Sequence, residues 1–211
     1  MLINNHRQKS TQLTMHTNKT AAEFLLYSTP NQWLETVLAD FDTFLCDHAS
    51  AEKKASGMAI TMISHYPDKT ELVDVMSAVA VEELNHFREV IKIIHQRGKI
   101  LVGDVKDNYV GELRKSFRKG SEFYMMDRLI IAGIIEARGA ERFGIIADGL
   151  PSGSLKDFYI TITESEQRHY TTFLDLAHRY SDTDDVNKRT LELLIVEAEI
   201  CAAQPFRAAL H

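Results

Sequence analysis

A repeated spacing of glutamate and histidine residues constrains the fold more than any other feature of the sequence. The motif Glu-x-x-His occurs twice, and each copy follows a single glutamate at nearly the same distance, 31 residues in one case and 30 in the other. One such motif arises readily by chance, so the argument for a metal site depends on the repeat and on its helical context. The pattern predicts a two-metal site inside a four-helix bundle. The residues are Glu52, Glu83 and His86, followed by Glu136, Glu166 and His169.

The composition fits one helical domain. The chain has 211 residues, is 45% hydrophobic, and contains only four Pro and ten Gly. Apolar residues recur every three or four positions, and no segment alternates convincingly as a strand would. Cys46 and Cys201 lie in apolar helical stretches without a Cys-x-x-Cys pair, so we expect them in the core. We predict a flexible arm over residues 1–19 and a single all-α domain over residues 20–211.

The cell compartment is predicted from two absences in the sequence. Residues 1–19 are polar and lack the apolar region of a signal peptide. No run approaches the roughly 18 apolar residues that a membrane span needs. We therefore expect a cytoplasmic protein without a membrane partner.

Capping signals divide the chain into four long helices and several shorter ones. Thr29, with Pro30 and Gln32 behind it, has the form of a capping box that begins the first long helix. Asp68 is the expected cap of the second, and Gly98 its expected end. This order predicts a ferritin-like four-helix bundle with one crossover connection and additional N- and C-terminal helices. The expected helices cover residues 21–27, 29–66 with a bend near 40, 68–97, 108–117, 121–149, 152–180 and 183–202.

Each long helix carries its glutamate on the apolar face. Glu83 and His86 fall on the stripe formed by residues such as Val79 and Val90, and Glu52, Glu136 and Glu166 interrupt equivalent stripes. Four ionised carboxylates in an apolar core would repel one another and cost several kcal/mol each, roughly, without a neutralising cation. Two divalent ions would balance the four charges. Carboxylate oxygen and imidazole nitrogen suit iron or manganese.

Simpler explanations exist for individual residues. A buried glutamate is often paired with an arginine, and Arg88, Arg138 and Arg142 are available. Matched spacing of all six residues favours metal binding over ion pairing. We expect His48, one turn before Glu52, to be a core histidine rather than a support for that ligand. Three other glutamates near the motifs are expected on a solvated face: Glu82, Glu141 and Glu164. Three further histidines have no matching set of carboxylates and are not proposed as ligands: His65, His95 and His178.

The six residues and their flanking segments resemble those of the bacterial tRNA 2-methylthio-N6-isopentenyladenosine hydroxylase family. The resemblance extends over roughly residues 24–207, and no ligand position departs from it. The metal motif is common to all ferritin-like proteins, so the resemblance to this particular family depends on the segments that flank the motif. The flanking segments are Ala51-Glu52-Lys53-Lys54-Ala55 and Ala80-Val81-Glu82-Glu83-Leu84-Asn85-His86-Phe87.

The resemblance implies a non-haem di-iron monooxygenase that hydroxylates the isopentenyl group of the modified adenosine beside the tRNA anticodon. It implies two iron ions per chain, O2 as co-substrate, an electron-donating reductase, and a monomer or small homo-oligomer. Glu52, Glu83 and His86 would serve one iron. Glu136, Glu166 and His169 would serve the other, with Glu83 and Glu166 as bridges and no catalytic group beyond the ligands.

A net charge of −6 is unusual for a nucleic-acid-binding protein, because Lys and Arg normally supply the phosphate contacts. Local basic patches would have to compensate. An anticodon loop presents unstacked bases, so a small basic rim with a few aromatic residues would suffice. The candidates are Lys53, Lys54, Arg97 and Lys99, and a second cluster of Arg114, Lys115, Arg118 and Lys119.

Several other functions use the same residue pattern. Another ferritin-like di-metal oxidase or oxygenase, a manganese catalase, or an iron-storage protein would use these ligands. A non-catalytic helical scaffold would bind no stoichiometric metal. The two histidine motifs do not distinguish iron from manganese.

Overall fold

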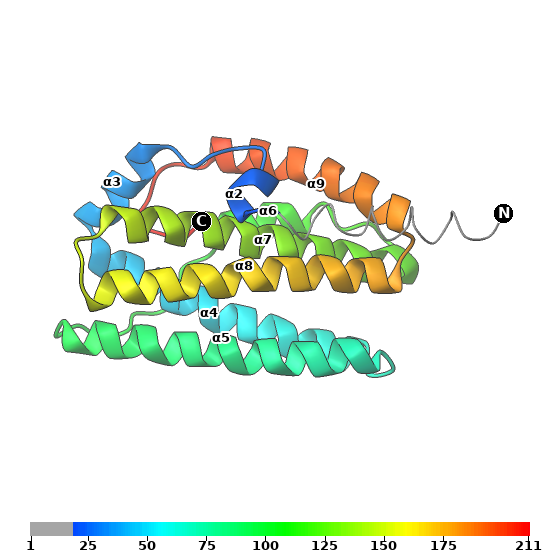
Figure 1. Ribbon diagram of the computed structural model, residues 1–211, viewed down its shortest axis with the longest axis horizontal. Helices are drawn as coiled ribbons and strands as arrows, with labels where there is room; N and C mark the ends of the chain where they lie inside the picture. The colour runs from blue at the N-terminus through cyan, green and yellow to red at the C-terminus, as the bar shows by residue number, and fades with distance from the viewer. Residues whose placement is uncertain (1–18) are drawn as a thin grey trace. The chain divides into compact units, whose positions relative to one another are not determined.

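The computed structural model describes residues 19–211, apart from the side chains of residues 121 and 122; almost all of the predicted arm lies outside the described residues. Within residues 19–211 all regular secondary structure is helical, in eight helices (Figure 1). The prediction of an all-α protein is confirmed. No helix in this part of the chain is long and apolar enough to cross a membrane.

The described residues form two compact units. One comprises residues up to Thr29 together with Asn108–Gln204, and the other comprises Pro30–Asp107 together with Pro205–His211. The prediction of a single domain over residues 20–211 stays a prediction.

The unit that begins at Pro30 is built on two long antiparallel helices, α4 and α5 (Figure 1). The predicted bend near residue 40 is a break, where the Asp40 carboxylate accepts a hydrogen bond from the backbone N–H of Thr43 at 3.3 Å and caps α4. The predicted capping box at Thr29 is wrong, because α3 is preceded by Pro30 without a side-chain cap. The helices of this unit are α3 (Asn31–Ala39), α4 (Phe41–His65) and α5 (Thr70–Gln96).

The two ends of α5 differ in how well the sequence predicted them. The expected cap at Asp68 is wrong, since Lys69 occupies the N-cap position and makes no side-chain capping bond. The expected end is confirmed. Gly98 adopts a left-handed φ of 70°, and the Lys99 N–H donates to the Ile94 carbonyl at 3.1 Å, which is the hydrogen-bond pattern of a Schellman motif.

Aromatic side chains and the C-terminal segment complete the core of this unit. Trp33 packs edge-on against Phe44, with ring centroids 6.4 Å apart. The Trp33 indole Nε1 donates to the Ala209 carbonyl at 3.1 Å, and the backbone N–H of Leu210 donates to Asp47 at 2.7 Å. The last residues of the chain are therefore held on α3 and α4.

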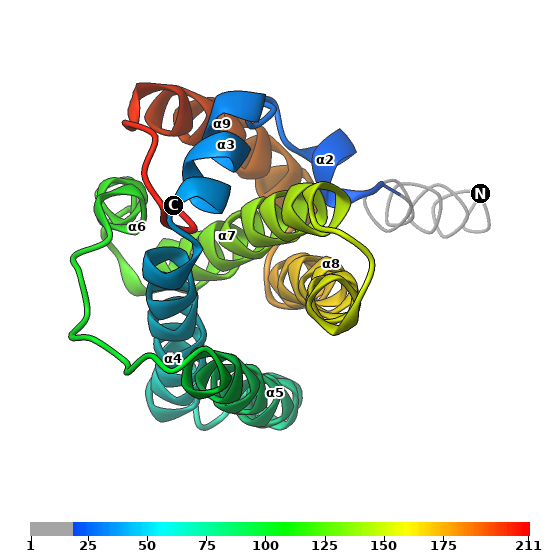
Figure 2. The same cartoon turned by 90° about the vertical axis from the view of Figure 1, so that its left-hand side faces the viewer.

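The other unit is centred on α7, which contacts α8, α9 and α2 (Figure 2). The observed bounds of its three long helices differ from the predicted ones by two residues or fewer. The acidic start of α9 acts as expected, because the Asp182 carboxylate accepts from the backbone N–H groups of Asp184 and Asp185. The helices are α2 (Ala21–Phe24), α6 (Asn108–Arg114), α7 (Ser121–Gly149), α8 (Ser154–Tyr180) and α9 (Thr183–Ala203).

A glycine allows α7 and α8 to approach closely. A Cβ atom at Gly133 would lie 3.2 Å from the Tyr170 carbonyl oxygen and 3.4 Å from side-chain atoms of Phe173 and Leu174. Six residues further along α7, a Cβ at Gly139 would lie 3.9 Å from the Glu166 Cγ atom. These contacts fix the facing surfaces of the two helices on either side of Glu136.

Candidate metal centre

Four helices carry the six predicted ligands, as the apolar stripes indicated. Glu52 lies on α4 and Glu136 on α7, while α5 and α8 carry one Glu-x-x-His motif each. Burial of these side chains is nearly complete, which excludes an ordinary solvated charge pattern. The exposed fractions are 3% for Glu52, 0% for Glu83, 7% for Glu136, 3% for Glu166 and 3% for His169, and the His86 side chain is 12% exposed.

Glu52, Glu83 and His86 form a triad within their unit. The His86 Nδ1 atom lies 3.3 Å from a Glu83 carboxylate oxygen and 3.5 Å from a Glu52 carboxylate oxygen. One ligand atom of each residue lies within 4.8 Å of those of the other two. This separation is short enough for one small cation to contact all three groups.

Electrostatics in this triad favour a positive charge. Burial alone would lower the pKa of His86, but hydrogen bonds from its ring to Glu52 and Glu83 raise the pKa to about 10. Without metal, the imidazole therefore holds a proton between the two carboxylates. A metal ion bound by the same atoms would displace that proton and supply the balancing charge.

His48 supports Glu52 from the side away from His86. It is completely buried, and its Nε2 atom lies 2.6 Å from a Glu52 carboxylate oxygen. Burial, and then the charge on His86, lower the pKa of His48 to about 3, although Glu83 acts in the opposite direction. A neutral His48 must donate its Nε2–H to Glu52. The prediction that His48 lies in the core is confirmed, but the expectation that it does not support Glu52 is wrong, since its ring contacts that carboxylate.

Glu136, Glu166 and His169 form the second triad within the other unit. The His169 Nδ1 atom lies 3.5 Å from a Glu166 carboxylate oxygen, and one ligand atom of each residue lies within 4.8 Å of the other two. Glu166 faces α7, where its Cγ atom lies near Gly139. The structure thus brings together each set of three residues that the sequence grouped.

Gln167, which lies between Glu166 and His169 in the sequence, forms hydrogen bonds with the start of the described chain. The Gln167 side chain accepts from the backbone N–H of Ala21 at 2.8 Å and donates to the Lys19 carbonyl at 3.1 Å. The Tyr170 hydroxyl donates to the same carbonyl. Residues 19–21 therefore lie against the part of α8 that carries Glu166 and His169.

The donor chemistry of both triads fits a transition-metal ion. Each triad offers two carboxylates and one imidazole, a set that suits iron or manganese. Two ionised carboxylates in a buried site need a cation nearby. The residues present are consistent with one divalent ion at each triad.

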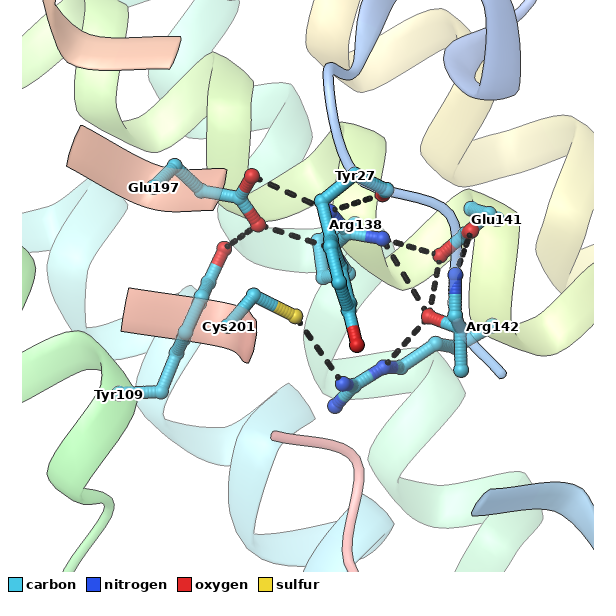
Figure 3. A network of polar contacts seen from close by, with 8 residues as sticks. Tyr27, Tyr109, Arg138, Glu141, Arg142, Glu197 and Cys201 are labelled. Atoms are coloured by element: carbon cyan, nitrogen blue, oxygen red, sulfur yellow. Dashed lines mark hydrogen bonds and ion pairs between the residues drawn. The ribbon is translucent and has the colours of Figure 1, made fainter. Parts of the chain in front are cut away.

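The three arginines considered as partners for these glutamates have other contacts. Arg138 binds Glu197 and Glu141, Arg142 binds Thr29 and Cys201, and Arg88 donates to Asn85. Figure 3 shows the contacts of Arg138 and Arg142 with the acidic and cysteine side chains. The charge of Arg138 is therefore balanced by Glu197 and Glu141.

The same network corrects two local predictions. Glu141 was expected on a solvated face, yet its side chain is only 7% exposed and accepts hydrogen bonds from Arg138 and from both the N–H and hydroxyl of Thr29. The Thr29 hydroxyl also accepts from the Arg142 Nε atom at 3.3 Å, so it belongs to this network, and Pro30 is the N-cap residue of α3. Glu197, on α9, was not singled out from the sequence, although it interrupts an apolar stripe as the ligands do.

The helices and the two buried triads define a protein of the ferritin-like helical class. A solved structure, protein 43 with aldehyde deformylating oxygenase activity from Synechococcus, matches with a TM-score of 0.85 and 30% identity, covering 89% of this chain and 95% of that chain. The predicted fold class is confirmed. The chain belongs to the tRNA-(MS[2]IO[6]A)-hydroxylase (MiaE) family, whose model matches residues 16–211.

Two relatives carry the same function in their names. A tRNA 2-(methylsulfanyl)-N(6)-isopentenyladenosine(37) hydroxylase from Pseudomonas putida is 37% identical over 171 residues, which are 81% of this chain and 82% of the relative. The protein of that name from Salmonella typhimurium is 31% identical over 154 residues, 73% of this chain and 56% of the relative. The resemblance inferred from the ligand motifs and their flanks is confirmed.

Proposed function

We propose that this protein hydroxylates the isopentenyl group of 2-methylthio-N6-isopentenyladenosine in tRNA, next to the anticodon, as an O2-dependent di-iron monooxygenase. Membership of a family of tRNA hydroxylases supports the substrate and the reaction. The observation that carries the proposed chemistry is the pair of buried triads, each with two carboxylates and one imidazole.

The six ligands are proposed to hold two iron ions per chain. Glu52, Glu83 and His86 would bind one ion, and the second triad, Glu136, Glu166 and His169, would bind the other. Bound iron would supply the activation of O2 that carbon–hydrogen hydroxylation requires.

The protein's own residues have three tasks in this proposal. The four carboxylates balance the charge of two divalent ions, and His48 keeps Glu52 oriented toward its ion. Apolar neighbours on the ligand stripes, such as Ala49 and Ala140, are almost fully buried and keep water from the ligands. No acid–base residue beyond the ligands is proposed.

The reaction needs partners that balance its atoms and electrons. One oxygen atom of O2 enters the isopentenyl carbon–hydrogen bond, and the other leaves as water after taking up two electrons and two protons. A reductase is the proposed electron donor, and a monomer or small homo-oligomer the proposed state. A tRNA substrate is consistent with the expected cytoplasmic location.

Metal analysis and product analysis test the proposal together. The protein is reconstituted anaerobically with ferrous iron, and we expect two ions per chain. Glu83→Ala and His169→Ala should each lower that content, whereas Glu89→Ala and His95→Ala, exposed positions on α5, should not. Fewer than one ion per chain in the wild type, or unchanged content in the ligand variants, would contradict the metal assignment.

The substrate assignment has its own readout. Modified tRNA is incubated with the iron-loaded protein, O2 and a reductant, then digested, and the nucleoside is examined for one added oxygen. Absence of that product with reduced iron in place would favour a different ferritin-like oxidase or oxygenase. Manganese at the site together with O2 release from peroxide would indicate a catalase instead, and a large hollow multimer would indicate iron storage.

A further inference from the structure

The segment around the start of α7 combines positive charge with aromatic side chains. Residues 114–128 contain five Lys or Arg against two Asp or Glu, in a chain with a net charge of −6. Arg114 and Lys119 are exposed there. A local excess of positive charge in an acidic protein marks a region that attracts polyanions.

Two neighbouring aromatic rings in this segment are exposed. Phe123 is 39% exposed and Tyr124 is 36% exposed, although aromatic side chains of this size usually lie inside a protein. Phe117 packs edge-on against Tyr124, with ring centroids 5.4 Å apart, and so holds that ring in place. The rings therefore form a fixed apolar surface in a basic surrounding.

Guanidinium groups lie over both exposed rings. Arg118 lies over the Phe123 ring at 4.7 Å from the centroid, and Arg128 lies over the Tyr124 ring at 5.7 Å. Planar guanidinium groups and aromatic rings are the surfaces on which unpaired bases stack. The segment thus contains two pairs of an exposed aromatic ring with an arginine over it.

A buried aspartate fixes the position of Arg118. The Asp127 side chain is completely buried and accepts a hydrogen bond from the Arg118 Nη2 atom at 2.7 Å. It also accepts from the Arg189 Nε atom at 3.0 Å. Because two arginines share one carboxylate, the region keeps a positive excess while Arg118 is held in one orientation.

We propose that this surface, which we call the α7 entry cluster, binds the unpaired bases and phosphates of the tRNA anticodon loop. The inference rests on the proposed function and adds the residues that hold the substrate. Stacking on the rings would give affinity without base preference, and the exposed cations would contact phosphates. The α7 entry cluster consists of Arg114, Phe117, Arg118, Lys119, Phe123, Tyr124 and Arg128.

The other basic candidate predicted from the sequence is less suited to RNA. Lys53 is paired with Asp104 at 2.8 Å, and Asp42 binds Arg97 at 2.5 Å and Lys99 at 3.1 Å. Phosphates would have to compete with these carboxylates. In the α7 entry cluster region, Lys115 is likewise paired with Glu112, so it is left out of the proposed surface.

The cluster is too far along α7 to hold the reacting group. Phe123 precedes Glu136 by 13 residues, which is about 20 Å of helix. The cluster would therefore bind nucleotides other than the one that is hydroxylated. Its loss should weaken RNA binding without changing the chemistry at the ligands.

Binding of a labelled RNA hairpin with an anticodon-loop sequence tests the proposal. Fluorescence anisotropy of the full-length protein is measured with Phe123→Ala, Tyr124→Ala and the double variant Arg114→Ala/Lys119→Ala. Each aromatic variant should bind about 5- to 100-fold more weakly. The double charge variant should lower the slope of log affinity against log salt by about 2.

Matched controls separate the cluster from general effects. Phe206→Ala removes an aromatic residue of similar exposure, and Lys106→Ala removes an exposed charge elsewhere in the chain. Both should bind the hairpin as the wild type does. Iron content should be unchanged in the cluster variants and each should melt in a single cooperative transition, which shows that they fold and bind metal.

The outcomes distinguish this inference from the proposed function. Hairpin affinity that is unchanged in all cluster variants, while the wild type binds and hydroxylates tRNA, would overturn the inference alone. Slower electron transfer from a reductase with unchanged RNA affinity would also overturn it and assign the surface to a protein partner. A wild type that neither binds nor hydroxylates modified tRNA would instead remove the proposed function.

Discussion

Arg138 on α7 and Glu197 on α9 form an ion pair in which both side chains are completely buried. The Arg138 Nε atom donates to one carboxylate oxygen at 2.8 Å, and its Nη2 atom donates to the other at 3.1 Å. The Tyr109 hydroxyl donates to the same carboxylate at 3.0 Å, and Arg138 also donates to the Tyr27 carbonyl at 2.8 Å (Figure 3). One guanidinium thus connects α7 with α9 and with the segment that precedes α3.

Removing the carboxylate of this pair should be strongly destabilising. Glu197→Ala leaves the buried Arg138 charge without its main partner, and we expect a loss of about 3–5 kcal/mol in the free energy of unfolding. Urea denaturation at neutral pH measures it. Glu199→Ala, an exposed position two residues away, should change the free energy by less than about 0.5 kcal/mol. Equal effects of the two substitutions would show that the pair is not important for stability.

Asp127 should contribute stability that disappears in acid. Burial would raise the pKa of this carboxyl, but hydrogen bonds from Arg118 and Arg189 hold its pKa below the usual aspartate value. A lowered folded-state pKa stabilises the protein above the unfolded value near pH 4, and the contribution is lost as pH falls through the folded pKa. Asp127→Asn should therefore cost about 2 kcal/mol at pH 7 and progressively less below about pH 4.

Denaturation curves from pH 7 down to pH 2 measure that difference. Asp148→Asn, an exposed position on the same helix, is the matched control and should track the wild type throughout. A difference between wild type and Asp127→Asn that stays constant with pH would exclude ionisation as its cause.

His48 should affect metal affinity without binding metal itself. His48→Ala removes the Nε2–H group that orients Glu52, and we expect metal affinity to fall about 10- to 100-fold. Competition with a chromophoric chelator measures the affinity. His95→Ala on α5 is exposed and should leave it unchanged. If His48→Ala binds iron as tightly as the wild type, Glu52 does not need this support.

Metal removal should lower stability through the carboxylates that the metal neutralises. Iron at about 100 times its dissociation constant should stabilise the folded protein by about 2.7 kcal/mol relative to the chelated protein. Thermal melting with and without ferrous iron shows the difference. In Glu83→Ala the shift should shrink, whereas a non-catalytic scaffold would show no shift in either protein.

Gly133→Ala should disturb the triad on α7 and α8 from a distance. The added Cβ would lie 3.2 Å from the Tyr170 carbonyl, one residue beyond His169, so α8 must move. We expect a loss of about 1–3 kcal/mol in stability and weaker iron binding. Gly144→Ala is the control, because its Cβ meets only Thr163 at an ordinary 3.6 Å and alanine favours a helix. A Gly133→Ala protein as stable as Gly144→Ala would show that the helices are not tightly spaced.

Helical periodicity explains why so much of the structure was predictable. The apolar stripes depend only on residues three and four apart, so they predicted correctly that the face carrying the glutamate of each long helix is buried. Local capping rules were less successful. Thr29 and Asp68 have the right residue types, but Thr29 binds Glu141 on α7, a contact between residues 112 positions apart in the sequence.

The Arg138 network shows the limit of the stripe argument. Val186, Leu193, Glu197 and Cys201 follow one face of α9, and the glutamate interrupts that face as the metal-ligand candidates do theirs. Its charge is balanced by an arginine 59 residues earlier in the chain. A buried glutamate on an apolar stripe therefore indicates a need for positive charge, which an arginine meets at Glu197 and a metal ion would meet at the proposed ligands.

The contact between His48 and Glu52 gives the first triad a feature that the sequence does not repeat at the second. The position one turn before Glu136 is occupied by Ala132, where the first helix has His48. Glu52 accepts a hydrogen bond from His48. The repeat that contains Glu136 has no imidazole at the corresponding position. An ion bound by the first triad would therefore meet a glutamate whose orientation is fixed by an imidazole, whereas the second repeat has an alanine at the corresponding position.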